Sequence, residues 1–172
     1  VELLASRSPL PAEAVDLFAA VALLEKEPVT LRARALRALV KSGVATDAVV
    51  RALAKTEGEL QAVWEEFVRD GRHAQRVDFF AQLAAAEKSE VAFGVLARLA
   101  NAKGTPKEAK AAASRAVERA WSQADLLVPL LRAVGRAREN AYAFQVLTFA
   151  KDARPDVKKA AAYAAEQLGL NK

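Results

Sequence analysis

Apolar residues recur along this chain with the period of an α-helix. Near the start they stand at i, i+3, i+4, i+7 and i+8, as Val15, Phe18, Ala19, Ala22 and Leu23. That spacing places them on one helical face. Later windows repeat the pattern, and no β-branched run bounded by turns appears. The sequence therefore predicts an all-α chain of about ten helices joined by short turns.

Three stretches of the chain follow one template, namely residues 14–40, 91–121 and 142–170. Each reads as an apolar helix, a turn that ends in proline, and an alanine-rich helix with basic residues on one side. The turn prolines are Pro28, Pro106 and Pro155. Repeated helix pairs are typical of solenoids. We therefore expect a right-handed α-solenoid that forms a single domain over residues 1–172.

A second register links the later copies. At a separation of 51 residues, Ala92-Phe93 and Val95-Leu96 match Ala143-Phe144 and Val146-Leu147, and Phe79-Phe80 falls on Leu130-Leu131. A unit of this length is longer than an ordinary two-helix repeat. It suits a helix pair plus one further helix.

Several local features predict details of the helices. The stretch Thr105-Pro106-Lys107-Glu108 has the spacing of a capping box with proline at the first helical position. Pro129 falls inside an expected helix, so we expect it to bend that helix. The segment 142–149 is apolar almost all round, so we expect neighbours to sandwich it. Gly94 and Gly135 are isolated within helices, which indicates close helix packing.

Composition narrows the chemistry. The chain is 53% hydrophobic but only 6% aromatic, and much of the difference is alanine. The absence of cysteine excludes disulfides, thiolate zinc sites, C-x-x-C-H haem attachment and thiol nucleophiles. Methionine is also absent, so we expect the chain to be a piece of a longer product. No apolar stretch is as long as a membrane span, so no membrane partner is expected.

Candidate catalytic residues are sparse. His73 is the only histidine, and we expect it at the surface or at a helix cap. Glu65, Glu66 and Asp70 lie opposite an apolar stripe, which favours a solvated face over acid–base chemistry. No G-x-S-x-G motif and no glycine-rich phosphate loop is present. We therefore expect no enzymatic activity, with no catalytic residue, no cofactor and no metal site.

Charge is placed unevenly along the chain. Residues 1–97 carry 12 Lys and Arg against 14 Asp and Glu, whereas residues 98–172 carry 14 against 7. Basic residues recur on the second helix of each copy. We call this set the basic stripe, and its members are Arg34, Arg37, Lys41, Lys110, Arg115, Arg119, Lys158 and Lys159. Second helices line the concave, binding face of stacked repeats, where cations can neutralise phosphates or an acidic protein.

The last copy carries a family resemblance. Its sequence Asp156-Val157-Lys158-Lys159-Ala160-Ala161, after a turn proline, resembles HEAT repeats. The ending, residues 154–170, is also similar to the HEAT-like segment of large secreted planctomycete-type proteins, where the segment precedes a c-type cytochrome domain. That resemblance implies a spacer or docking domain of a redox protein, with a periplasmic or secreted location.

These observations lead to two hypotheses from different classes. The first is a non-enzymatic scaffold, or protein–protein interaction module, that holds adjacent domains or binds a protein partner. The alternative is a HEAT-like nucleic-acid-binding protein that uses the basic stripe. No aromatic residue is interleaved with these cations, which gives base stacking little support. A glycosylase-like enzyme is a distant third, because the sequence places no acidic residue beside exposed aromatics.

Overall fold

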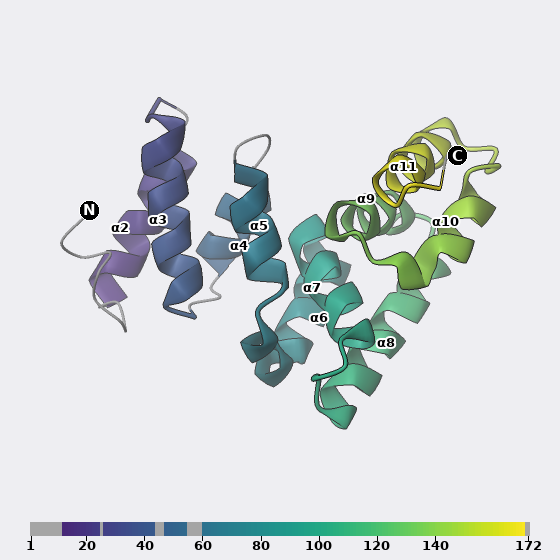
Figure 1. The fold of residues 1–172 in the computed structure, drawn as a ribbon, viewed down its shortest axis with the longest axis horizontal. Helices are drawn as coiled ribbons and strands as arrows, with labels where there is room; N and C mark the ends of the chain where they lie inside the picture. The colour runs from purple at the N-terminus through teal and green to yellow at the C-terminus, as the bar shows by residue number, and fades with distance from the viewer. Residues whose placement is uncertain (1–11, 25, 44–46, 55–59, 171–172) are drawn as a thin grey trace. The chain divides into compact units, whose positions relative to one another are not determined.

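The computed structural model describes residues 12–24, 26–43, 47–54 and 60–170 (Figure 1). These residues form ten α-helices and two 3-10 helices, and they contain no strand, which confirms the all-α prediction for the described part. The chain divides into two compact units, residues 1–70 and 71–172. The solenoid and the single domain stay predictions, because the placement of the units relative to each other is not determined.

Unit 1 contains four described helices. They are α2 (Ala12–Leu23), α3 (Val29–Lys41), α4 (Asp47–Ala54) and α5 (Gln61–Val68). Helix α3 packs against the other three. The apolar stripes predicted for α2 and α5 lie in the core, where Phe18, Trp64 and Phe67 are almost completely buried. Helix α3 ends at Lys41, and Gly43, two residues later, has a φ of 73°, the left-handed conformation that closes many helices.

Unit 2 contains six α-helices and two 3-10 helices. In chain order they are η2 (Gly71–Arg76), α6 (Val77–Glu87), α7 (Glu90–Asn101), α8 (Lys107–Trp121), α9 (Leu127–Ala137), η3 (Asn140–Tyr142), α10 (Ala143–Phe149) and α11 (Pro155–Gln167). Helix α7 lies at the centre and packs against α6, α8 and α9. Helix α9 packs against both α7 and α11.

The packing of α9 on α11 depends on a glycine. A Cβ atom added at Gly135 would lie 2.6 Å from the Cα of Ala164. No side chain fits at that distance, so the two helix backbones can approach only because position 135 has none. This confirms the expectation of close helix packing at Gly135.

The prolines of the template do not occupy equivalent positions. Pro28 and Pro106 are N-caps, with ψ angles of 137° and 143° that lie outside the helix, whereas Pro155 is the first residue of α11. The predicted capping box at Thr105–Glu108 is therefore wrong. The carbonyl of Pro106 already accepts the first helical bond, from the Lys110 amide at 2.9 Å, and no side chain caps α8. Thr105 precedes the N-cap of α8 by one residue, so its side chain does not cap that helix.

Two other predictions of local structure are corrected. Helix α9 begins at Leu127, so Pro129 lies in its first turn rather than in its interior. Backbone N–H groups of a first turn have no intrahelical acceptor, so Pro129 costs no hydrogen bond and gives no reason for a bend. Helix α10 is not sandwiched, since Phe144 and Leu147 are 79% and 47% exposed. Its packing against other elements is chiefly with α11 and η3, which leaves its outer side uncovered.

Candidate functional site

All eight members of the basic stripe are exposed. Three lie on α3 in unit 1, and five lie on α8 and α11 in unit 2. On each helix the buried positions are the apolar residues of the opposite side. The helices therefore place these cations in solvent, as the periodicity predicts.

Helix α3 carries its three cations on one side. Arg34, Arg37 and Lys41 are spaced i, i+3 and i+7, which brings them onto one face. The helix contains no acidic residue. Arg32 belongs to the structural part of α3, since its Nε donates to the carbonyl of Ala22 on α2 at 3.0 Å.

On the helices of unit 2 the cations are less well aligned. Arg115 and Arg119 are one turn apart on α8 and share a face. Lys110 precedes Arg119 by nine residues, and at 3.6 residues per turn the two point about 180° apart. Lys158 and Lys159 are consecutive on α11 and diverge by about 100°. The structure therefore brings Arg115 and Arg119 together, and it separates Lys110 from them.

Three cations elsewhere in unit 2 form ion pairs with carboxylates that are distant in the sequence. Lys88 lies 3.1 Å from Asp125, Arg98 lies 3.2 Å from Glu139, and Arg132 lies 3.4 Å from Glu90. Among the described residues, the five stripe cations of α8 and α11 form no such pair. In the described part of unit 2, three cations therefore pair with carboxylates distant in the sequence, whereas the five stripe cations do not.

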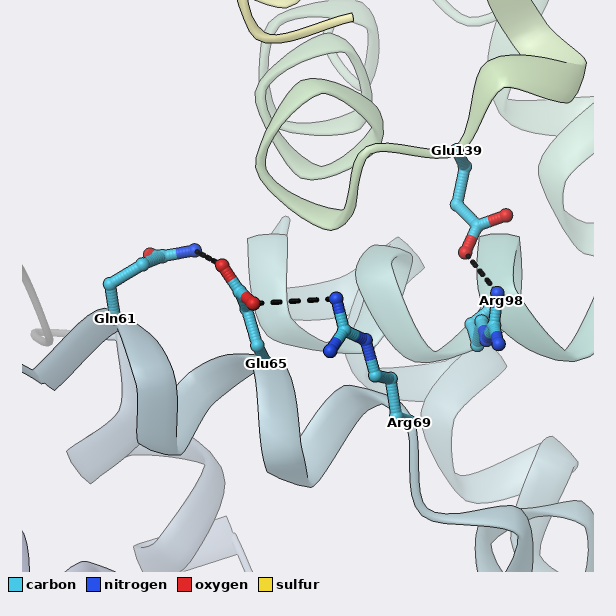
Figure 2. Close-up of polar contacts among 5 residues, drawn as sticks. All are labelled: Gln61, Glu65, Arg69, Arg98 and Glu139. Carbon is cyan, nitrogen blue, oxygen red and sulfur yellow. Dashed lines mark hydrogen bonds and ion pairs between the residues drawn. The ribbon is translucent and has the colours of Figure 1, made fainter.

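The pair between Arg98 and Glu139 is the most buried of the three. Glu139 is only 6% exposed, and its Oε1 accepts from Arg98 Nη1 (Figure 2). A buried carboxylate needs such a partner, because its charge is costly to remove from water. The pair holds the residue before η3 against α7. The sequence offers no signal for it, because the partners are far apart along the chain.

The acidic cluster on α5 is used within that helix. Glu65 accepts from Gln61 Nε2 at 3.1 Å and lies 3.3 Å from Arg69 Nη2 (Figure 2). Glu66 is exposed. These are the i, i+4 contacts of a helix surface. Glu65 therefore serves the local structure, and Glu66 matches the predicted solvated face.

The prediction for His73 is wrong. The side chain is buried in η2, and its ring lies edge-on to Phe80, with centroids 4.8 Å apart. Burial arises because η2 packs against α6, α7 and α8, so His73 fills a core position rather than a cap. Within the described ranges, no group of three or more histidine and acidic side chains is placed to hold a metal ion.

A polar cluster across three helices escaped the sequence analysis. The charges of Arg132 and Arg136 of α9 and of Glu90 of α7 act on Tyr163 of α11. Burial raises the pKa of the Tyr163 hydroxyl, and the nearby cations oppose that shift. Only tertiary packing assembles this cluster, since its residues lie on three helices that are far apart in the sequence.

The turn between α10 and α11 contains a compact ion pair. Asp152 accepts from the backbone amide of Arg154 at 2.9 Å and from its guanidinium at 2.8 and 2.7 Å. These charge-assisted bonds lower the pKa of Asp152 to about 2. Arg154 is thereby tied to the turn and is less available to a ligand.

Comparisons with known proteins add no relative. No family model, no curated protein and no solved structure matches this chain. No helix in the described part of the chain is long and apolar enough to cross a membrane.

Proposed function

We propose that this chain is a non-enzymatic protein-interaction module, built from HEAT-like helix pairs, that acts as a docking or spacer domain of a larger protein. Its partner is an acidic protein surface. The exposed cations of α8 and α11 in unit 2 bind that surface, with Arg115 and Arg119 of α8 as the best-aligned pair.

The division of cations in unit 2 carries this proposal. Three cations of unit 2 pair with carboxylates distant in the sequence, whereas the exposed cations of α8 and α11 form no such pair among the described residues. Exposed cations without an internal partner are free to meet an external anion. Complementary charge raises the rate and the specificity of association.

Nucleic acid is the alternative partner. The same free cations support it, because phosphate neutralisation needs only exposed Lys and Arg. Stacking of bases on aromatic rings has less support. Among the described residues of the helices that carry the basic stripe, Tyr163 is the most exposed aromatic, and its side chain is partly buried. An acidic protein requires no such rings, so we place it first.

Two fluorescent probes, poly-L-glutamate and a short DNA duplex, test the proposal over a salt series from about 50 to about 200 mM. We expect wild-type protein to bind poly-L-glutamate, and Arg115→Ala/Arg119→Ala to weaken that binding severalfold. The matched control is Lys103→Ala/Lys107→Ala, which removes the same charge from exposed positions beside the start of α8. The control should bind like wild type.

The outcomes separate the hypotheses. Equal loss in both variants would mean that net charge alone attracts the probe, which contradicts the proposal. Duplex binding that persists at about 200 mM salt and depends on Arg115 and Arg119 would favour the nucleic-acid alternative. Folding is checked with Arg115→Ala/Arg119→Ala/Lys158→Ala/Lys159→Ala, whose unfolding free energy should change by less than about 0.5 kcal/mol per substitution at exposed positions.

A further inference from the structure

The structure points to a helix-docking surface on α10. We propose that the outer face of α10, formed by Phe144 and Leu147, binds an acidic amphipathic helix of a partner protein. The partner helix would lie on α10 as α9 lies on α7. This inference deepens the proposed function and rests on it, because it names the place where the module holds a partner.

The internal repeat shows that these side chains belong to a packing surface. Phe144 and Leu147 match Phe93 and Leu96 of α7 in the 51-residue register. The α7 residues are 1% and 0% exposed, whereas their counterparts on α10 are 79% and 47% exposed. The same apolar pair is therefore core in one copy and surface in the next.

The neighbours of the two helices explain the difference. Helix α7 packs against the second helix of its pair, α8, and also against α6 and α9. Helix α10 packs mainly against its own second helix, α11. In the described part of the chain, no helix covers α10 in the way that α9 covers α7 (Figure 1). An exposed phenylalanine and leucine on one helix face form an apolar surface against which the apolar face of an amphipathic helix can pack.

The inner side of α10 is held firmly. Val146 is fully buried, and the ring of Phe149 stacks on Trp121 of α8 with centroids 5.7 Å apart. The ring of Tyr142, just before α10, also packs near this indole, with ring centroids 5.9 Å apart. These contacts set the rotation of the helix, so Phe144 and Leu147 face outward before any partner arrives. Such preorganisation lowers the entropic cost of binding.

The charge at the C-terminal end of α10 favours an acidic partner. Helix α10 itself carries no charged residue. Among the exposed charged side chains of the following turn and first turns of α11, Lys151, Lys158 and Lys159 are basic and Asp156 alone is acidic. The stretch 98–172 as a whole carries 14 basic against 7 acidic residues. Two copies of this surface would repel each other, whereas glutamate beside an apolar helix face would be attracted.

A synthetic peptide tests the proposal. The probe is the α9 sequence 126–138 with Arg132→Glu, Arg136→Glu and Arg138→Glu, labelled for fluorescence anisotropy and titrated with the full chain. We expect Phe144→Ser/Leu147→Ser to weaken binding at least tenfold, and the unmodified α9 peptide to bind wild type severalfold more weakly. The matched control is Leu17→Ser/Leu24→Ser, which removes two leucines of similar exposure from unit 1 and should leave binding unchanged. Phe144→Ser alone, checked by circular dichroism, guards against loss of folding.

Each result decides the inference. Peptide binding that is absent, or that is insensitive to Phe144→Ser/Leu147→Ser, overturns it. A wild-type dimer in analytical ultracentrifugation that Phe144→Ser/Leu147→Ser dissociates also overturns it, because a second copy then covers the face. If the peptide binds through Phe144 and Leu147, but Arg115→Ala/Arg119→Ala leaves poly-L-glutamate binding intact, then the proposed role of the basic stripe is wrong. The docking surface on α10 would still be supported.

Discussion

Helices α7 and α10 share the pattern Ala-Phe-x-Val-Leu and meet opposite environments. In α7 seven consecutive residues, 91–97, are buried, whereas in α10 only Val146 is. Local sequence does not explain the difference at Phe93 and Leu96, because Phe144 and Leu147 occupy the matching positions. The number of neighbouring helices explains the difference in burial, because α7 has contacts on three sides and α10 has contacts chiefly on one. A repeated motif therefore specifies a helix and its inner face, while the adjacent elements decide what becomes core.

The sharpest way to break this comparison is to truncate the matched phenylalanines. We expect Phe93→Ala to lower the unfolding free energy by about 3–5 kcal/mol, because it leaves a cavity in the core. Phe144→Ala should change it by less than about 0.5 kcal/mol, because the ring is mostly in solvent. Guanidinium denaturation followed by circular dichroism measures both. Similar losses for the two variants would show that α10 is covered in solution.

A second test concerns the helix that covers α7. Gly135→Ala places a Cβ atom 2.6 Å from the Ala164 backbone, which forces α9 away from α11. We expect a loss of about 1–3 kcal/mol from overpacking, despite the better helix propensity of alanine.

The control for this substitution is Gly104→Ala, where an added Cβ meets no atom within 4 Å. It should stay within about 0.5 kcal/mol of wild type. Thermal unfolding of both variants gives the answer. Equal stability of Gly135→Ala and Gly104→Ala would mean that α9 is not seated on α11 at this distance.

The smallest expected effect lies in the turn that joins α10 to α11. The folded state lowers the pKa of Asp152 from 3.8 to about 2, so the ionised carboxylate stabilises the fold above pH 3.8. That contribution falls as the pH drops from 3.8 through about 2, where the carboxylate takes up a proton. Asp152→Asn should be slightly less stable than wild type at pH 7, and the difference should shrink in this acidic window.

Denaturant midpoints of wild type and Asp152→Asn, measured from pH 7 down to pH 3, test this expectation. A difference that stays constant over the range would show that the Asp152 charge is not responsible. The turn of the α7–α8 pair has no matching carboxylate, so the same series on Thr105→Ala should show no such pH dependence.

Helix positions were predictable because they depend on local pattern. The apolar stripe of α2, and the apolar side of α5 opposite Glu65 and Glu66, follow from periodicity. Prediction failed by a single residue at Pro106, because proline is compatible both with the N-cap and with the first helical position. Exposure of the basic stripe was also predictable, since each cation lies opposite apolar residues of its own helix.

Long-range features could not be predicted in the same way. The burial of His73, the Arg98–Glu139 pair and the surroundings of Tyr163 depend on elements that meet only in three dimensions. The helical period states which residues share a face, but it does not state what that face meets.

The sequence by itself determined that this protein is all-α over its described residues and that the cations of the basic stripe face solvent. These properties depend on backbone propensity and on the amphipathic period, which act within a few residues. Only the tertiary structure decided that Phe93 is core and Phe144 is surface, that Gly135 admits a helix backbone, and which cations of unit 2 are already paired. Those properties depend on which helices are neighbours, and burial is a property of the neighbour as much as of the residue.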